Sequence, residues 1–583
     1  MVFMEPFIAR PERRARLLHR PVVAVLSFGI ACAAVAQVDP RGDPGTILQT
    51  VPQAPKRPDS GPVIEDRVTR PRAIVDVEGM RLEIKGFRIV GLTVAASDVM
   101  VEELSPFVGP DKRFQDLLDA AAAIKRRLAG MGFFLADVVV PEQKIADGIV
   151  ALQVLEGRLG KVRLDIDPAV PVDRDLLQSY VAGLEEGGLI RTDDVERALF
   201  QIHDLRGIVA TSSFAPGTAS GTADLTIRVA PAKRMDANID FDANGSVYTG
   251  IHRVGAGIDA NSLFGKGDLL SLRANNAIDG HLRYARLSLL VPMGPWGTKV
   301  GGAYSDLDYR LGTPSFESLK VTGSANVTSL TLIHPIIRSR NNNLLLIAQN
   351  DMREYHDLQV ASATDTRKKT PVKSISLSGD FRDRVLGGGI NVYNAAYTLG
   401  QLKFGTSALL AADLAGRRTS GEYAKTNVTV SRLQAISERL AFYGSFSQQF
   451  TNKNLDPSEK FSLGGPNAVR AYPQGEGAGD EGFVGTYEFR YRVPVEEDLP
   501  GSMVVTGFYD FGRSILIKQP TAADKAANTA VMRRIGGLGV GLNWEVPNNW
   551  YLRATLGFRD TSKATADHLL RFPRFYMQFS KFF

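Results

Sequence analysis

The part of the chain from about Ala232 to Phe583 alternates apolar and polar residues with a period of two, and no convincing helix appears in it. Its short runs are separated by glycine, asparagine and aspartate, which is typical of antiparallel strands joined by turns. The segment 483–493 shows this best: one face carries Phe483, Tyr487, Phe489, Tyr491 and Val493, and the other carries Thr486, Glu488, Arg490 and Arg492. An apolar strand face suits lipid or the core of a soluble sandwich, so this strand alone leaves both alternatives open.

The N-terminus carries the pattern of an export signal. Five arginines precede an apolar run at 22–35 that ends in Ala34-Val35-Ala36. We therefore expect residues 1–36 to be a signal peptide, because the run is too short to span a bilayer as a helix. The only cysteine, Cys32, lies inside this segment, so the exported chain would have no disulfide. Acylation of Cys32 as a lipoprotein is the weaker alternative, because Gly29 stands where such signals carry leucine.

Two further observations favour a transmembrane barrel over a soluble sandwich. The C-terminal segment places Phe575, Met577, Phe579 and Phe583 on one face, with Lys581 as the exception. Residues 232–583, at roughly 22 residues for each strand with its connection, make about 16 strands, an even number. After the signal no apolar stretch reaches the about 18 residues that a membrane helix needs. The predicted fold class is therefore mainly β, a transmembrane antiparallel β-barrel of about 16 strands over 232–583.

Two similar α+β units precede the barrel, at 80–158 and 159–231, each in the order β-α-α-β-β. The first has expected strands at 82–92, 134–140 and 149–156 and helices at 97–109 and 114–129. The second has expected strands at 161–166, 209–216 and 223–229 and helices at 173–183 and 192–205. Such a tandem repeat has no evident site of its own, but the edge strands of its sheets suit an added strand from an unfolded client.

The segment 37–79 is rich in proline and carries scattered charges, so we interpret it as a linker. A short plug helix around Ile47 is compatible with the apolar patch there, although the proline spacing limits its length.

One connection in the barrel, 451–482, is far longer than a hairpin needs. At its centre Arg470 stands between Val469 and Ala471-Tyr472, with Gly464-Gly465 before it. We interpret the connection as a hairpin folded back into the barrel, with Arg470 at its tip and the glycine-rich stretch 475–480 as a flexible hinge.

Composition and motifs argue against catalysis and nucleic-acid binding. The net charge of +6 comes from 69 basic and 63 acidic residues spread along the chain, and no basic patch with interleaved aromatics is present. The seven histidines lack metal-ligand spacing, and no G-x-S-x-G motif occurs. We therefore expect no catalytic residues, no metal, no cofactor and no small-molecule substrate.

The order of signal peptide, two α+β units and barrel resembles the outer-membrane transporters of two-partner secretion. These are the TpsB-type activation-secretion proteins of haemolysins and adhesins, whose α+β units are polypeptide-transport-associated (POTRA) domains. The resemblance rests, in chain order, on Gly132 to Gln143 with Gly148 and Gly157, Asn244-Gly245, Asn261 to Asp268, Phe461 to Gly465 with Val469 to Tyr472, and Phe508 to Asp510. Each motif is weak alone, and five in the right order are strong.

The resemblance implies a lock between loop and lumen, in which Arg470 holds Asp510 through two parallel hydrogen bonds. The implied lock residues are Arg470, Asp510, Phe508, Val469, Tyr472, Gly464 and Gly465. In a wet lumen this pair would contribute only about 1–3 kcal/mol. The family usually has glycine after the arginine, and Ala471 would cost about 1 kcal/mol if its position required a positive φ.

The same resemblance assigns partner contacts in the first unit to Pro141, Gln143, Gly148 and Gly157. It implies a translocator in the outer membrane of a Gram-negative bacterium, with two POTRA domains in the periplasm. The expected partners are a large unfolded exported protein and the lipid membrane, and a monomer is expected. The alternatives are a barrel-assembly factor of the same superfamily and a passive solute channel. The linker lacks the long helix that plugs the pore in some relatives, so plugging does not follow from the sequence.

Overall fold

The computed structural model describes residues 43–51, 63–66, 81–219, 221–313, 320–361, 363–494, 499–560, 563–567 and 571–583. The predicted signal peptide lies outside these ranges.

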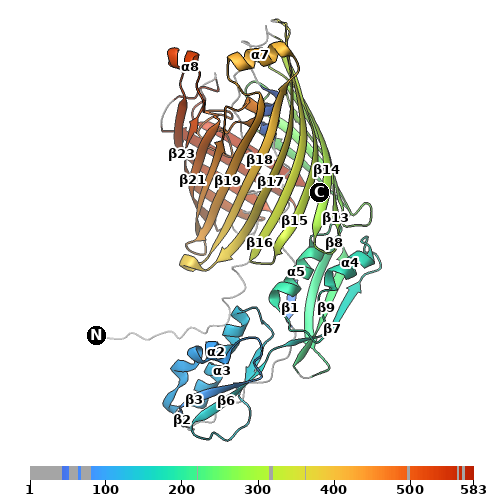
Figure 1. Cartoon of the computed structure of the whole chain (residues 1–583), viewed down its shortest axis with the longest axis vertical. Helices are drawn as coiled ribbons and strands as arrows, with labels where there is room; N and C mark the ends of the chain where they lie inside the picture. The colour runs from blue at the N-terminus through green and yellow to red at the C-terminus, as the bar shows by residue number, and fades with distance from the viewer. Residues whose placement is uncertain are drawn as a thin grey trace, which may run out of the picture.

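The C-terminal part forms one closed barrel in which every strand pairs antiparallel with its neighbours in the chain (Figure 1). The last strand, β25, closes the ring by pairing with the first, β10, so no sheet edge is left. The wall consists of β10 (Met235–Asp242), β11 (Arg253–Asn261), β12 (Leu269–Ala277), β13 (Leu282–Met293), β14 (Thr298–Arg310), β15 (Val321–Arg338), β16 (Asn342–Gln359), β17 (Thr364–Asp383), β18 (Gly389–Phe404), β19 (Gly421–Ala435), β20 (Leu440–Thr451), β21 (Glu481–Val493), β22 (Ser502–Ile515), β23 (Met532–Val546), β24 (Trp550–Arg559) and β25 (Arg574–Phe582). The predictions of the fold class and of about 16 strands are confirmed.

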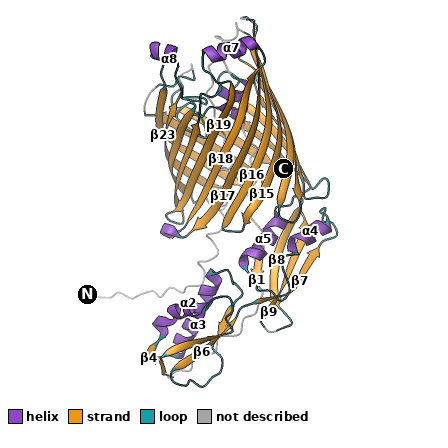
Figure 2. Cartoon of the chain, in the orientation of Figure 1, coloured by secondary structure: helices purple, strands orange, loops and turns teal. Residues whose placement is uncertain are grey.

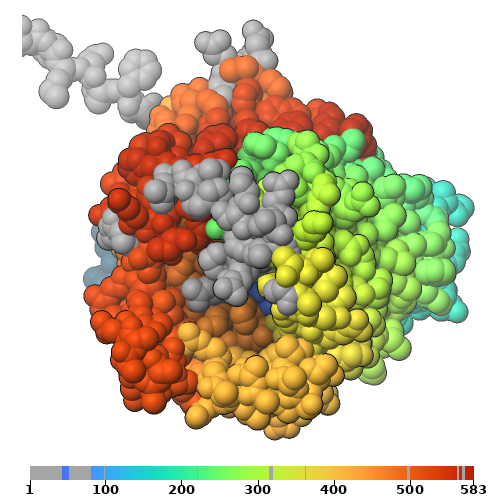
Figure 3. All heavy atoms as spheres, turned by 90° about the horizontal axis from the view of Figure 1, so that it is seen from above, coloured from blue at the N-terminus to red at the C-terminus, as the bar shows by residue number. Residues whose placement is uncertain are grey.

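Alternation along the strands decides which residues face outward. In β25 the side chains of Phe575 and Phe579 are exposed on the outer surface, whereas Tyr576 and Ser580 are buried. Because successive side chains of a strand point to opposite faces, one sequence period supplies both an apolar outside and a polar inside. Seen from above, the strands follow one another around the ring in chain order (Figure 3). Among the described helices, none is long and apolar enough to cross a membrane.

The first α+β module spans residues 82–155 and contains its own apolar core. Its elements are β2 (Leu82–Ile84), β3 (Gly86–Val90), α2 (Ser97–Leu104), η2 (Ser105–Phe107), β4 (Gly109–Lys112), α3 (Phe114–Gly130), β5 (Asp137–Val139) and β6 (Ile149–Leu155). The sheet order is β3-β6-β5, and Ile124 and Leu128 of α3 pack on Leu152 of β6. The strand expected at 82–92 is divided at Lys85, because β2 pairs with β4 while β3 pairs with β6.

The second module repeats the plan with β7 (Arg158–Ile166), α4 (Arg174–Val181), α5 (Thr192–His203), β8 (Ile208–Pro216) and β9 (Thr222–Pro231). Its sheet also contains β1 (Val63–Asp66), which comes from the linker and gives the order β1-β8-β9-β7. Figure 2 shows the helices of both modules on their sheets below a barrel wall made of strands. β1 was not predicted from the sequence.

The second module docks on the barrel rim through turns between strands. The backbone N–H of Asp173 donates to the Gly265 carbonyl in the β11–β12 turn at 2.9 Å. At another turn, Arg338 donates to both carboxylate oxygens of Asp204 at 2.8 and 2.7 Å, and its guanidinium lies over the ring of Phe200. These contacts set the direction in which the module leaves the barrel.

Two segments lie inside the barrel, enclosed by its wall. They are the helix α1 (Pro44–Thr50) and the long loop between β20 and β21, residues 452–480, here called the lumen loop. The lumen loop contains the 3-10 turn η4 (Pro457–Glu459), and α1 packs against η4 and against the wall at β14, β15 and β16. The remaining short elements are η3 (Val385–Gly387), α7 (Ser407–Ala415) and α8 (Ala522–Ala526), which occur in connections between barrel strands.

Candidate functional site

Arg470 and Asp510 meet inside the barrel with the fork geometry that a guanidinium and a carboxylate favour. Nε of Arg470 donates to Oδ2 of Asp510 at 2.8 Å, and Nη2 donates to Oδ1 at 2.9 Å. The backbone N–H of Arg470 adds a third bond to Oδ2 at 3.0 Å. The tip of the lumen loop is therefore held on β22 by side chain and backbone together.

Glu488 of β21 is a second acid on the same guanidinium, and its contact with Arg470 was not predicted from the sequence. Nη1 of Arg470 donates to Glu488 Oε2 at 2.8 Å, while Arg490 donates to Oε1 at 2.7 Å. The face of the guanidinium stacks on Phe508, 3.4 Å from the ring centroid. The pairing of β21 with β22 places Glu488 directly opposite Phe508. A prediction of this strand register from the sequence would therefore have placed Glu488 beside the arginine.

The burial of this cluster differs from the expected wet lumen. The side chains of Arg470 and Glu488 are each 5% exposed and that of Asp510 is 0% exposed. Two carboxylates lie here beside three guanidinium groups, those of Arg470, Arg490 and the nearby Arg553. Because a buried charge left without its partner is costly, removing one member should destabilise the docked loop by about 3–5 kcal/mol. The smaller contribution expected from the sequence, about 1–3 kcal/mol, assumed that water surrounds the pair, whereas these side chains are buried.

Ala471 follows the arginine without the backbone strain that its position suggested. Its φ is not positive, so alanine carries no left-handed penalty here. The space for the loop comes from the wall instead: a Cβ at Gly537 would lie 2.4 Å from the Ala471 Cβ, and a Cβ at Gly557 would lie 2.8 Å from the Ala471 Cα. Glycines in β23 and β24 therefore let the loop backbone approach the wall closely.

The other predicted lock residues shape the loop around Arg470. Val469 and Tyr472 are fully buried in an apolar cluster between loop and wall, and the Tyr576 hydroxyl donates to the Tyr472 carbonyl at 2.7 Å. Gly464 and Gly465 form the narrow turn that precedes Val469: the Val469 carbonyl accepts from Gly465, and a Cβ at Gly464 would collide with a carbonyl of the returning chain.

The glycine-rich stretch 475–480 is anchored, in contrast to the flexible hinge that we expected. Glu476 is buried and accepts from Arg533 at 2.7 Å and from the backbone N–H groups of Thr565 and Ala566 at 2.7 and 2.8 Å. The C-terminal stem of the lumen loop is thus held, as well as its tip.

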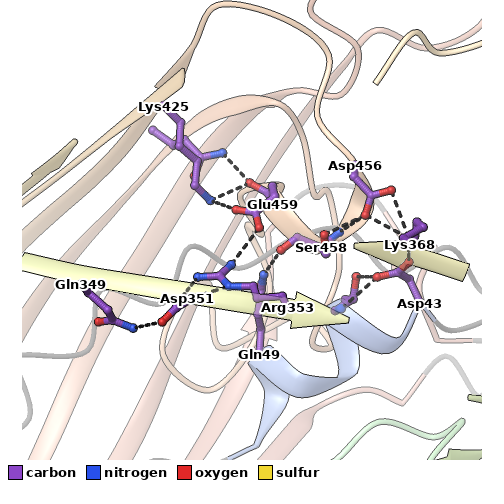
Figure 4. A network of polar contacts seen from close by, with 12 residues as sticks. Asp43, Gln49, Gln349, Asp351, Arg353, Lys368, Lys425, Asp456, Ser458 and Glu459 are labelled. Atoms are coloured by element: carbon purple, nitrogen blue, oxygen red, sulfur yellow. Dashed lines mark hydrogen bonds and ion pairs between the residues drawn. The ribbon is translucent and has the colours of Figure 1, made fainter. Parts of the chain in front are cut away.

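A second ionic cluster joins the lumen loop to α1 (Figure 4). Nζ of Lys368, on β17, donates to Asp43 at 2.5 Å and to both oxygens of Asp456 at 3.0 Å. The two acids come from separate segments, since Asp43 caps α1 and Asp456 precedes η4. One buried lysine therefore holds the helix and the loop at once.

Glu459 extends this cluster along the wall. It accepts from Arg353 on β16 and from Lys425 on β19, each at 2.8 Å. The side-chain amide of Gln49 in α1 donates to the Ser458 carbonyl next to it. Strands far apart in the chain are thus linked through the stem of the lumen loop.

The local sequence explains why α1 is helical. The Asp43 carboxylate accepts from the Thr46 N–H at 3.1 Å, and Pro44 occupies the first helical position, where its missing N–H has no cost. Ile47 packs in an apolar cluster with Tyr355 and its neighbours, and Arg253 donates to the Thr50 carbonyl at the helix end at 2.9 Å. The seven residues of α1 are too few to show a helical period, so only the short apolar patch signalled it.

The residues predicted for partner contact in the first module have local structural roles. Gln143 donates to the Ala151 carbonyl at 2.8 Å and accepts from the Ala151 N–H at 2.7 Å, which continues the ladder of β6 where β5 ends before Pro141. Gly148 and Gly157 take positive φ values of 74° and 73° in turns. The structure brings Pro141 and Gln143 together at one sheet edge, and the contact of any of the four with a partner stays a prediction.

Within the described ranges, no group of three or more histidine, cysteine, aspartate or glutamate side chains is placed to hold a metal ion.

Comparison with known proteins gives consistent similarities over most of the chain. The family model described as haemolysin secretion/activation protein ShlB/FhaC/HecB matches residues 221–543, and the model of the ShlB-type POTRA domain matches residues 82–157. The heme/hemopexin transporter protein HuxB of Haemophilus influenzae is 25% identical over 540 residues, covering 91% of this chain and 94% of the relative. The outer membrane transporter CdiB of Escherichia coli is 23% identical over 417 residues, covering 71% of this chain and 69% of the relative.

Solved structures support the fold. The structure of CdiB from Escherichia coli matches with a TM-score of 0.65 at 19% identity, covering 88% of this chain and 93% of that one. BamA from Haemophilus ducreyi, lacking POTRA domains 1–3, matches with a TM-score of 0.52 at 15% identity, covering 86% and 100%. Each match covers most of this chain, so the shared fold extends beyond the barrel alone.

Proposed function

Because the chain belongs to the haemolysin secretion/activation family ShlB/FhaC/HecB, we propose that it receives an unfolded exported protein at its POTRA domains and passes it outward through the lumen as a monomer. It is an outer-membrane transporter of two-partner secretion, with its barrel in the membrane and its POTRA domains in the periplasm. Its cargo is a secreted partner protein. The barrel-assembly alternative is not favoured.

The observation that carries this proposal is that a lysine on the wall holds both segments that occupy the lumen. Lys368 binds Asp43 of α1 and Asp456 of the lumen loop. With both segments docked the transporter is at rest, and a chain passes only after they move. The resting plug is thus built from α1 together with the lumen loop, although the linker carries no long helix.

Ionic anchors suit a plug that must leave and return. When the lumen opens, water and the passing chain can replace each lost hydrogen bond, so the charges are stabilised in the open state as well. An apolar seal of equal strength would expose hydrophobic surface to water instead. Because ATP is not available in the periplasm, we infer that folding of the partner outside the cell supplies the driving force.

Secretion of a partner protein by cells carrying charge variants tests this function. Arg470→Ala and Asp510→Ala should leave folded barrels, detected by heat-modifiable gel mobility, that secrete poorly. The swapped pair, Arg470→Asp with Asp510→Arg, should restore part of the secretion. Arg367→Ala is the matched control, because Arg367 forms an exposed pair with Asp365. If secretion were unchanged in every variant, the contact between Arg470 and Asp510 would have no role in transport.

A single-channel recording separates transport from passive solute flow. A passive channel would conduct steadily in the wild type and would be insensitive to Lys368→Gln, whereas a plugged transporter should be closed for most of the time and should open more often in that variant.

A further inference from the structure

The outer strand of the second POTRA sheet comes from the linker and not from the domain itself. β1 runs parallel to β8, with Val63 opposite Thr211 and Asp66 opposite Phe214. Since the sheet order is β1-β8-β9-β7, β8 would be the edge strand if β1 were absent (Figure 1). An edge strand presents backbone N–H and C=O groups that another extended chain can use.

β1 is a short occupant of a longer strand. It has four residues, whereas β8 has nine, and its pairing covers only the positions from Thr211 to Phe214. An extended segment that follows more of β8 would form more backbone hydrogen bonds than β1 does. The β8 edge is therefore a site where a longer strand can compete with the resident one.

The same linker ties β1 to the helix inside the barrel. α1 ends at Thr50 and β1 begins at Val63, and the chain between them reaches at most roughly 45 Å when fully extended. The end of α1 is held by Arg253, which donates to the Thr50 carbonyl from the start of β11, and β11 reaches the side of the POTRA domains at Asn261. That height is roughly 20 Å for a tilted strand of this length, so a large part of the reach is needed to leave the barrel.

We propose that β1 covers the edge of β8 in the resting transporter and that an extended segment of the exported partner displaces it. This displacement weakens the binding of α1 in the lumen. This inference rests on the proposed transport function and adds the place where the partner is first sensed. The partner segment is a strand of more than four residues lying along β8.

The coupling follows from the tether. While α1 is docked, the short linker keeps β1 close to β8 at a high effective concentration. When α1 leaves, β1 gains freedom and binds β8 less well. Linkage requires the reverse with the same factor, so displacement of β1 from β8 must ease the release of α1.

A disulfide across the β1–β8 pairing tests the inference in the full-length protein. Glu65 and Ser213 are opposite each other, so Glu65→Cys with Ser213→Cys would lock β1 in place. The control is Ser213→Cys with Thr226→Cys, which joins β8 to β9 and leaves the edge as it was. The probe is a labelled peptide with the sequence of residues 61–68, and its binding to the purified protein in detergent is measured by fluorescence anisotropy.

We expect oxidation of the Glu65–Ser213 pair to abolish both probe binding and partner secretion, and reduction to restore both, with no effect in the control pair. Ile64→Pro should strengthen probe binding several-fold, because it weakens the pairing of β1 with β8. Lys368→Gln should also strengthen probe binding, because release of α1 lowers the effective concentration of β1 at β8. Full secretion by the oxidised protein would overturn the inference while leaving transport intact. Suppose that probe binding changes in these variants as expected, but the wild type secretes no partner protein. That result would support the β8 edge as a strand-binding site and would contradict the proposed transport function.

Discussion

At the scale of single residues, Arg470 combines three kinds of contact in one side chain. Its fork holds Asp510, its remaining nitrogen holds Glu488, and its flat face covers Phe508. A lysine has one compact charge and no flat face, so it cannot reproduce this set.

Arg470→Lys should therefore weaken the docked loop although the charge is kept. We expect a loss of about 2 kcal/mol from the lost hydrogen bonds to the charged acids, compared with about 3–5 kcal/mol for Arg470→Ala. The measurement is the temperature at which the folded band disappears in heat-modifiable gels. If lysine behaved as well as arginine, the fork geometry would not matter and only the charge would.

Glu488→Gln tests the acid that was not predicted from the sequence. It leaves three guanidinium groups, those of Arg470, Arg490 and Arg553, beside one carboxylate, so the loop tip should become more accessible to protease from outside the cell. Glu354→Gln is the control, because Glu354 pairs with Lys369 at an exposed position of the same barrel. Equal protection in both variants would show that Asp510 alone balances the cluster.

At the scale of helices and strands, α1 and the lumen loop depend on one lysine. Lys368→Gln would leave Asp43 and Asp456 facing each other as two buried carboxylates, and their repulsion should expel α1. Planar-bilayer recordings should then show more frequent and longer openings. Lys369→Gln is a matched control, since this neighbouring side chain points outward and is 64% exposed. Openings that rise equally in both variants would exclude the shared lysine as the anchor.

The same scale shows what the sequence could and could not predict. Period-two alternation identified the barrel because every strand, such as β25 with Phe575 outward and Tyr576 inward, repeats the same physical constraint. The helices α3 and α5 were long enough to show their period. α1 and β1 were too short for any period, and their conformations are fixed by contacts with distant strands. Glu488 was assigned to the water-facing side because alternation gives the face of a residue but not its partner.

At the scale of the whole molecule, the second POTRA domain is held against the barrel rim by few side chains. Asp204 is the central one: burial alone would raise its pKa, but the hydrogen bonds from Arg338 and the nearby Lys299 lower it below the usual value. A lowered carboxyl pKa means that docking gains stability above the ordinary pKa near 4 and loses it as the pH falls toward the folded-state pKa. The docking should thus be fully present at neutral pH and weaken only in acid.

Asp204→Asn should loosen this docking at every pH at which the wild type is docked, because Arg338 would lose its two hydrogen bonds to a charged carboxylate. Spin labels on the second POTRA domain and on the barrel rim should report a broad distance distribution in the variant and a narrow one in the wild type. Asp165→Asn removes an acid from an exposed pair with Arg228 in the same domain and should leave the distribution narrow. A loosened domain places the β8 edge and its tether at variable distances from the lumen, so the same variant should also reduce secretion. If the distances broaden and secretion is unchanged, the direction of the POTRA domains is not part of the transport path.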